Sequence, residues 1–526
     1  MLNKEFVEHP LIKKESVQKR VYQELLTAKA IDQSTLVVAP TGLGKTIIAV
    51  LLIAYTYNKN KSIIFLAPTK PLISQHQKSL LKVLNIPSEK ILLLTGNIPA
   101  QKRKKYYEQE GLIICATPQT IRNDIQNKLI SKNNFNLLIF DEAHRAVGNY
   151  AYVEISSFFP ETIKRLALTA SPGSRRSKIQ EVADNLKIKH IEIKTEDDID
   201  VVDYIKNKEI ETVFIEPDSL SIKISNILES YILKKIEFLR KFNFKIPNSY
   251  TKKQIIQVQA SIFERIKKSK KSIWFIALST TSSLLKVFHA KELIETQGFY
   301  ALKSYLDRLF LESKDPNASK TIKSVIHSKE VLEVYKLLIN NIDHAVYSKE
   351  RELISIVNNY IKNNPKSKIL IFNNFRDNAA HLVTVLNKNK LIKSARFVGQ
   401  ATKGVADKGL SQKEQIQIIT DFKNGVYNNL VCTSVGEEGL DIPSVDLVVF
   451  YDAVASEIRS IQRRGRTGRF NVGKVILLLN KGTIDEHYYY VSMNKEQRMK
   501  KVLNNFNNKP LTKSKTKKKQ KTILDY

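Results

Sequence analysis

The sequence has few cysteines and no apolar run long enough to cross a membrane. Its 526 residues include two cysteines, Cys115 and Cys432, both in apolar stretches. We therefore expect buried thiols in a reducing compartment and no cysteine-based metal cluster. The longest apolar run, residues 47–55, is far shorter than the roughly 20 residues of a membrane-spanning helix. The N-terminus lacks a signal-peptide pattern, so we expect a cytoplasmic protein with no membrane partner.

Acidic residues are also scarce relative to basic ones. Lysine and arginine number 85 against 52 aspartates and glutamates, which gives a net charge of +33. Such an excess favours a polyanionic partner, above all nucleic acid. Lysine, isoleucine and asparagine are common throughout, so a biased genomic base composition remains an alternative source of part of this charge.

Proline and glycine are nearly absent from the middle of the chain. Between Pro247 and Pro316 the only such residue is Gly298, and apolar residues recur at helical spacing. On either side, apolar strands alternate with helical stretches, which is typical of parallel α/β domains. We predict strands at 36–38, 63–66, 112–115, 137–140, 166–168, 369–372, 430–432, 447–450 and 475–478. The predicted parts are an α/β domain at 1–210, a helical insertion at 211–345, a second α/β domain at 346–503 and a flexible basic tail at 504–526.

A glycine-rich loop follows the first predicted strand. Residues 39–46 read Ala-Pro-Thr-Gly-Leu-Gly-Lys-Thr, with Ala39 in place of the glycine of the general pattern. In such a loop, backbone N–H groups and the helix N-terminus bind phosphates, the lysine reaches the terminal phosphates, and the threonine ligates Mg²⁺. The nucleotide-binding residues predicted here are Thr41, Gly42, Gly44, Lys45 and Thr46.

An acidic pair ends another apolar strand. We predict that Asp141 is a Mg²⁺-side ligand and that Glu142 orients or deprotonates the attacking water. Acidic pairs also begin ordinary surface helices, but the strand before this one and the upstream loop favour catalysis. His144 has a simpler alternative role as a hydrogen-bonded polar residue at a domain interface.

Paired arginines lie far downstream on a glycine-rich turn. Residues 462–469 read Gln-Arg-Arg-Gly-Arg-Thr-Gly-Arg. We predict that Arg466 and Arg469 neutralise charge on the departing γ-phosphate and that Gln462 contacts the same group. Arginine clusters also occur as solvated surface or nucleic-acid patches. In the catalytic interpretation, the chain is a two-domain motor that hydrolyses a nucleoside triphosphate at its domain interface.

These motifs, in this order, resemble superfamily 2 helicases of the DEAH-box type up to about residue 500. Residues 141–144 read Asp-Glu-Ala-His, and residues 169–171 resemble the motif that links hydrolysis to domain movement. The resemblance implies two RecA-like motor domains that use ATP and Mg²⁺, with adenine read by Gln23. It implies nucleic-acid contacts at Thr69, Lys70, Thr117, Gln119 and Thr433. It implies a further motif, with Gly439 and Asp441, that touches both nucleotide and nucleic acid.

Longer strings resemble the archaeal Hef helicases, which are related to the Fanconi anaemia M translocase. They are residues 141–152, 396–401, 409–415 and, in the helical segment, 288–298. The resemblance implies an ATP-dependent, nucleoid-associated DNA helicase that moves 3′ to 5′ on forked or branched DNA in replication-fork repair and recombination. Many Hef proteins carry a C-terminal nuclease domain, whereas this sequence ends at Tyr526 without its motif, which leaves open a separate nuclease partner.

Two alternatives stay open at this point. An RNA helicase, or a double-stranded-RNA-stimulated ATPase of the same clade, would have the same nucleotide motifs and a helical insertion. A scaffold that recruits repair factors without hydrolysing ATP is a different class of function, against which the intact set of Lys45, Asp141, Glu142 and Arg466 argues.

Two basic segments lie outside these motifs. Arg265, Lys267 and Lys268 begin a cluster that we expect to contact the arms of branched DNA, although a solvated lysine-rich face is an equal alternative. In the basic tail, the spacing of Gln520, Ile523 and Tyr526 resembles peptides that bind sliding clamps. A tail that only adds nonspecific DNA affinity is the alternative there.

Overall fold

The computed structural model describes residues 5–170, 172–173, 175–196, 198–202, 204, 209–248, 250–400, 409–433, 443, 445–453 and 473–507, with side chains as far as residue 503. The described residues form two units. The first contains residues up to 204 together with the end of the last helix, from Met493. The second contains residues 209–492.

The strands of the first unit form one parallel sheet in the order β3-β4-β2-β5-β6-β1-β7. Strands β1, β2 and β4 are buried along their whole length, as in a sheet with helices on both faces. The strands are β1 (Thr35–Val38), β2 (Ser62–Leu66), β3 (Ile91–Leu94), β4 (Ile113–Ala116), β5 (Phe135–Phe140), β6 (Lys164–Thr169) and β7 (His190–Ile193).

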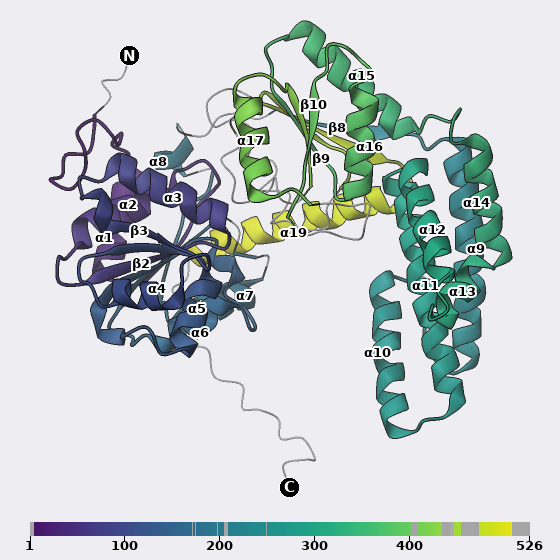
Figure 1. The fold of residues 1–526 in the computed structure, drawn as a ribbon, viewed down its shortest axis with the longest axis horizontal. Coiled ribbons are helices and arrows are strands. Elements are labelled where there is room, and N and C mark those ends of the chain that lie inside the picture. The colour runs from purple at the N-terminus through teal and green to yellow at the C-terminus, as the bar shows by residue number, and fades with distance from the viewer. Residues whose placement is uncertain are drawn as a thin grey trace. The chain divides into compact units, whose positions relative to one another are not determined.

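Helices cover both faces of this sheet. Figure 1 shows α1, α2 and α3 over one face and α5 and α6 over the other. The helices are α1 (Val21–Asp32), α2 (Lys45–Thr56), α3 (Lys70–Val83), α4 (Ala100–Tyr107), α5 (Pro118–Gln126), α6 (Ala151–Phe158), α7 (Arg176–Asn185) and α8 (Ile199–Val202), with 3₁₀ turns η1 (Ser88–Lys90), η2 (Lys132–Asn134) and η3 (Ala143–Arg145).

The second unit has its own parallel sheet, in the order β10-β11-β9-β12-β13-β8. Its strands are β8 (Glu209–Ile215), β9 (Ile369–Phe372), β10 (Ser394–Phe397), β11 (Asn429–Cys432), β12 (Leu447–Phe450) and β13 (Lys474–Asn480). The helices next to this sheet in the chain are α15 (Ser348–Asn363), α16 (Arg376–Leu386), α17 (Gln412–Lys423) and α19 (Ile484–Asn507).

The edge strand β8 corrects a predicted boundary. The sequence interpretation assigned residues from 211 onward to the helical insertion, but Glu209–Ile215 pair in register with Lys474–Asn480. The segment is rich in β-branched and aromatic residues, which favour a strand. The helical insertion therefore begins after this strand, at Ser219.

The helical insertion is a bundle with its own core. Its helices are α9 (Ser219–Lys241), α10 (Lys252–Lys268), α11 (Ser272–Thr296), α12 (Phe299–Ser313), α13 (Lys320–Ile326) and α14 (Lys329–Asn341), which Figure 1 shows packed alongside one another. Among the described helices, α11 alone has the length and hydropathy of a membrane span. Its buried residues, such as Leu284 and Val287, belong to the bundle core.

The fold predicted from the sequence is confirmed in class and order. Every predicted strand falls on an observed one, α2 begins at Lys45 as predicted, and a helical region separates the two parallel sheets. Cys115 on β4 and Cys432 on β11 are both buried thiols. Burial alone raises the pKa of the Cys115 thiol, so this group is an unreactive part of the core.

Candidate nucleotide site and nucleic-acid interface

The predicted site residues of the first unit gather at one edge of its sheet. In a parallel sheet, the segments that follow the strands converge at the carboxyl edge, where ligands bind. Residues 39–44 follow β1, Asp141 follows β5, and Thr169 is the last residue of β6. β5, β6 and β1 are neighbours in the sheet, so residues distant in sequence meet here.

The glycine-rich loop leaves the start of α2 open. Gly42 and Gly44 have φ values of +96° and +69°, a backbone region that L side chains rarely adopt. Gly44 is the N-cap of α2 and supplies no side-chain cap. The first backbone N–H groups of the helix therefore have no side-chain acceptor and suit an anionic phosphate.

Gln23 lies directly against this loop. Its side-chain amide donates a hydrogen bond to the Leu43 carbonyl oxygen (3.0 Å), which also accepts one from the Tyr22 hydroxyl (2.8 Å). A Cβ at Gly44 would lie only 2.7 Å from the Gln23 amide nitrogen. The residue predicted to read adenine therefore also supports the phosphate-binding loop.

Lys45 folds back over the same loop. Its ammonium group donates to the carbonyl oxygens of Ala39 (2.9 Å) and Pro40 (3.2 Å). The nearby Thr41 hydroxyl is buried and makes no hydrogen bond. Because a buried hydroxyl without a partner is costly, Thr41 is a candidate contact for a ligand in the loop.

Asp141 is held by a histidine that the sequence interpretation missed. His76 on α3 contacts the Asp141 carboxylate through Nε2 and Oδ2 at 2.7 Å, and both side chains are buried. Burial opposes ionisation, but the charge and hydrogen bond of His76 still hold the pKa of Asp141 below its ordinary value. Lys45 acts in the same direction. Asp141 is therefore a carboxylate at neutral pH, as a Mg²⁺ ligand must be.

Glu142 sits in a backbone conformation unusual for its residue type. Its φ of +50° and ψ of +48° lie in the left-handed region. Its Oε2 lies 3.3 Å from His144 Nδ1 but makes no hydrogen bond, and the same histidine nitrogen lies 3.1 Å from the Thr169 hydroxyl. Strain of this kind is common at functional sites. His144 thus connects the predicted water-activating residue to β6.

The residues present fit a magnesium–nucleotide complex. Two buried oxygens without hydrogen bonds, Thr41 Oγ1 and Glu142 Oε2, accompany an ionised Asp141 and the open start of α2. Thr46 lies in the first turn of α2, where a hydroxyl suits Mg²⁺ coordination. The bound ion would supply charge neutralisation at the phosphates.

A second group of predicted residues lines a cavity of about 450 Å³ in the same unit. Lys70, Thr117 and Gln119 face it from the starts of α3 and α5. Lys70 donates to the Asn97 side chain (3.1 Å), and the Thr117 hydroxyl lies 2.9 Å from that of Thr120. Thr69 caps α3 by accepting from Leu72 N (3.4 Å). The structure thus brings the predicted strand-contacting residues of this unit together.

Of the residues predicted in the second unit, Thr433 lies at the end of a sheet strand and Arg265 lies in the helical bundle. Thr433, at the end of β11, is buried, and its N–H donates to the Phe397 carbonyl oxygen (3.1 Å). Arg265 lies over two aromatic rings, with its guanidinium carbon 4.6 Å from the Phe244 centroid and 4.9 Å from that of Trp274. Arg265 therefore packs the bundle through cation–π contacts.

Two lysines of the same cluster are on the surface. Lys267 pairs with Glu264 (3.0 Å), and both side chains are exposed, while Lys268 is exposed at the end of α10. Gln462, Arg466, Arg469, Gly439, Asp441, Gln520, Ile523 and Tyr526 lie outside the described residues.

Comparisons with known families match all three parts of the chain. Residues 11–174 match the family described as "Type III restriction enzyme, res subunit". Residues 222–344 match "Putative ATP-dependent RNA helicase, helical bundle". Residues 348–471 match "Helicase conserved C-terminal domain". The fold and its motifs therefore define a superfamily 2 helicase core.

A solved structure identifies the family within the superfamily 2 helicases. The crystal structure of the Pyrococcus furiosus Hef helicase domain is 39% identical, with a TM-score of 0.68, and the match covers 92% of this chain and 100% of that one. The chain belongs to the family of Hef helicases.

Longer relatives share the same region. The chain is 39% identical to "Putative ATP-dependent RNA helicase MJ1505" of Methanocaldococcus jannaschii, over 95% of this chain and 62% of that protein. It is 35% identical to "ATP-dependent DNA helicase MPH1" of Pyricularia oryzae, over 92% of this chain and 45% of that protein. The chain thus spans about half to two thirds of the length of these relatives.

Proposed function

We propose that this protein is an ATP-dependent DNA helicase or translocase. The observation that carries this proposal is the His76–Asp141 pair beside the open glycine-rich loop, in a chain that belongs to the Hef family. The DNA helicases of Pyricularia oryzae and of Schizosaccharomyces pombe match over 92% and 89% of this chain, which supports DNA as the substrate.

Each residue of the site has a definite task in this proposal. The N–H groups at the start of α2 bind the β- and γ-phosphates, and Lys45 leaves the Ala39 and Pro40 carbonyls to contact the γ-phosphate. Thr46 and Asp141 hold Mg²⁺. Glu142 orients water for attack on the γ-phosphate, in line with the departing ADP. Its Oε2 makes no hydrogen bond, and His144 Nδ1 lies 3.3 Å from it.

We further propose that the substrate is forked or branched DNA and that movement runs 3′ to 5′. The cavity lined by Lys70, Thr117 and Gln119 contacts one DNA strand through its phosphates. In the insertion, Lys267 and Lys268 remain candidate contacts for DNA arms, since their charges are exposed. We do not extend this role to Arg265, which packs against two aromatic rings.

RNA is the competing substrate. It is favoured by the name of the helical-bundle family and by that of the Methanocaldococcus jannaschii relative, both of which specify an RNA helicase. Strand displacement separates the two proposals. A DNA fork with a 3′ single-stranded tail should be unwound faster than one with a 5′ tail and faster than the matching RNA duplex. Faster unwinding of the RNA duplex would contradict the DNA assignment, and a 5′-tail preference would contradict the polarity.

The tail supports a separate proposal about a partner. Gln520, Ile523 and Tyr526 are spaced like a peptide that docks on a sliding clamp, at the end of a basic segment. Calorimetric titration of the clamp with a peptide covering residues 511–526 should give heat, which Ile523→Ala with Tyr526→Ala should remove. Equal heats from the two peptides would refute clamp binding.

A further inference from the structure

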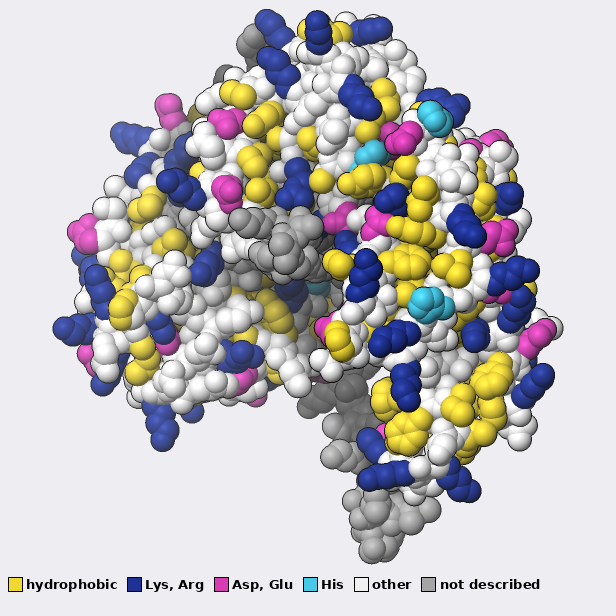
Figure 2. Space-filling view, turned by 45° about the vertical axis from the view of Figure 1, so that its right-hand side comes forward, with side chains coloured by type: hydrophobic (Ala, Val, Ile, Leu, Met, Phe, Trp, Pro, Cys, Tyr) yellow, Lys and Arg dark blue, Asp and Glu magenta, His cyan; other side chains and the backbone are white. Residues whose placement is uncertain are grey.

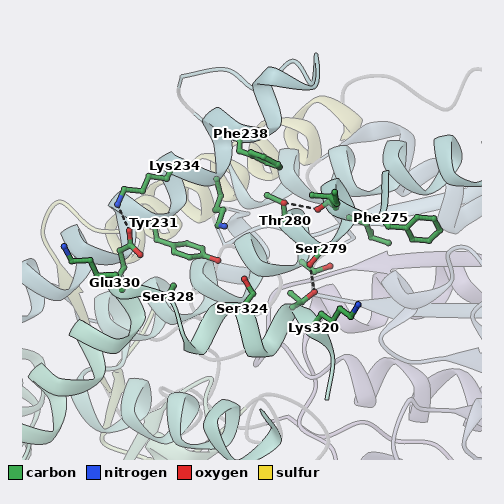
Figure 3. Close-up of a pocket in the computed structure, with 16 residues that line it drawn as sticks. Tyr231, Lys234, Phe238, Phe275, Ser279, Thr280, Lys320, Ser324, Ser328 and Glu330 are labelled. Atoms are coloured by element: carbon green, nitrogen blue, oxygen red, sulfur yellow. Dashed lines mark hydrogen bonds and ion pairs between the residues drawn. The ribbon is translucent and has the colours of Figure 1, made fainter. Parts of the chain in front are cut away.

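The helical insertion contains a cavity of about 1000 Å³, away from the basic cluster on α10. Three walls enclose it, from α9, α11 and the α13–α14 segment, as Figure 3 shows. On α9, Tyr231, Lys234, Lys235 and Phe238 follow the i, i+3, i+4, i+7 spacing of one helix face.

The charge of this cavity is strongly positive. Four lysines line it against a single glutamate: Lys234, Lys235, Lys320 and Lys329 against Glu330. Lys234 pairs with Glu330. Among the described residues, Lys235, Lys320 and Lys329 have no ion-pair or hydrogen-bond partner, and the Lys235 ammonium group lies 5.4 Å from the centroid of the Tyr231 ring. The ammonium groups of Lys320 and Lys329 therefore remain for an anionic ligand, and that of Lys235 can join them.

Hydroxyl groups line the floor of the cavity. Ser279 on α11 and Thr321 on α13 contact each other across it at 2.9 Å, and Ser324 lies beside them. The Tyr231 hydroxyl points into the cavity in Figure 3. Tyr231 is 3% exposed, its hydroxyl has no hydrogen-bond partner of good geometry, and the neighbouring Ser283 hydroxyl donates to the Thr280 carbonyl oxygen. A buried hydroxyl in this state has a donor to offer to a ligand.

Aromatic rings complete the cavity. Phe238 is half-buried, and Phe275 is 49% exposed, with the equally exposed Ile276 next to it. Figure 2 shows hydrophobic side chains of the helical part gathered among lysines and arginines. An exposed ring beside lysines can stack on a base only when that base is unpaired, because a duplex presents its phosphates outward.

We propose that this cavity binds a short single-stranded DNA segment, such as the unpaired arm of a fork. The bases stack on Phe275 and Phe238, while the phosphates contact Lys235, Lys320 and Lys329 and accept a hydrogen bond from Tyr231. The proposal rests on the DNA-directed function above and adds a second strand-binding site, separate from the cavity at Lys70 and Thr117.

The first experiment measures the affinity of the full chain for two forks by fluorescence anisotropy. One fork has a single-stranded dT arm, and the other is fully duplex. Phe275→Ala with Lys320→Ala should weaken binding of the single-stranded arm about tenfold, the size expected for one lost stacked base and one lost phosphate contact. Binding of the duplex fork should not change. The matched control is Phe263→Ala with Lys314→Ala, which removes an exposed ring and an exposed lysine outside the cavity.

A milder variant separates binding from folding. Tyr231→Phe removes a hydroxyl that has no hydrogen bond in the free protein, so the urea midpoint should be unchanged or higher. Its affinity for the single-stranded arm should nevertheless fall about threefold. Photo-crosslinking with 5-iododeoxyuridine in the arm should label peptides of α9, α11 or α13.

Equal losses for the cavity and control variants, unchanged affinity, or crosslinks only outside α9, α11 and α13 would overturn the proposal. The ATPase activity of the same preparations distinguishes a failure of the proposed function from a failure of the cavity proposal. If no DNA stimulates the wild-type ATPase, the proposed function fails; if DNA stimulates it while the cavity variants bind normally, only the cavity proposal fails.

Discussion

The side chain of Gln297 donates a hydrogen bond to Asp452 Oδ2 at 2.8 Å, across 155 residues of sequence. Gln297 ends α11 of the helical bundle, and Asp452 follows β12 of the second sheet. The Gln297 side-chain oxygen accepts from Asn373 (2.8 Å) and Asn378 (2.9 Å). One buried amide therefore joins the helical bundle to three points around the second sheet.

Neighbouring contacts extend this junction. The Tyr347 hydroxyl donates towards the Ile294 and Glu295 carbonyl oxygens at 3.0 Å, and its ring blocks any side chain at Gly298. Lys349 and Asp485 form an ion pair that is completely buried. Because these groups satisfy one another inside the unit, the helical bundle and the second sheet behave as one body.

Replacing Gln297 should loosen this body. Gln297→Leu removes four buried hydrogen bonds, because the same amide also donates to the Thr296 hydroxyl, and it leaves polar groups unsatisfied. We therefore expect roughly 2–4 kcal/mol of lost stability. Trp274 on α11 is the only tryptophan, so its fluorescence in urea reports on the helical bundle directly. Gln257→Leu, on the exposed face of α10, is the control and should change the midpoint little. Equal effects of the two variants would refute the junction.

Glu292 on α11 should make the second unit sensitive to acid. Burial opposes its ionisation, but His289, Lys252 and Tyr488 lower the pKa of its carboxyl to about 2. Because this pKa lies below that of an unfolded glutamate, the stabilisation is complete above about pH 4.5 and disappears as the pH falls towards 2.

The predicted size is roughly 3 kcal/mol at neutral pH, from the lowering of this pKa. Glu292→Gln should therefore reduce the urea midpoint at pH 7, and the difference from wild type should shrink at pH 4 and below. A difference that stays constant between pH 7 and pH 3 would show that Glu292 acts through packing instead of charge.

His76 should be needed for hydrolysis although it does not touch the nucleotide in the proposed mechanism. His76→Ala removes the group that holds Asp141, and loss of such an outer partner typically lowers metal affinity or activity about ten- to hundredfold. We expect lower ATP turnover that higher Mg²⁺ concentrations partly restore. His190→Ala, on β7, removes a histidine paired with Glu192 and serves as the control. Unchanged Mg²⁺ dependence in His76→Ala would contradict this role.

Site residues that directly follow an apolar strand could be predicted from the sequence, whereas contacts between distant segments could not. Lys45 and Asp141 could be predicted because each directly follows an apolar strand, so a local pattern places it at the carboxyl edge of the sheet. His76 could not be predicted, because it lies 65 residues from Asp141 in sequence. The two side chains meet only because β2, which precedes α3, pairs with β5. Gln297 stood within a string that resembled Hef helicases, but its partner Asp452 depends on the folded second unit.

Arg265 shows the converse. Its charge and its place in a basic cluster predict a phosphate contact, but they do not predict that the partly buried side chain packs over Phe244 and Trp274. Net charge does not reveal which cations already have aromatic or acidic partners. In the same way, β8 was missed because it pairs with β13, which lies more than 250 residues later in the sequence.

The central claim is that this chain couples ATP hydrolysis to DNA. The most direct measurement compares ATP turnover and ATP binding in the wild type, Lys45→Ala and Glu142→Gln, each with forked DNA, linear duplex DNA, double-stranded RNA and no nucleic acid. We expect forked DNA to stimulate the wild type most. Lys45→Ala should neither bind nor hydrolyse ATP, and Glu142→Gln should bind it without turnover. Wild-type turnover that is the same with and without DNA, or full turnover by Glu142→Gln, would contradict the account.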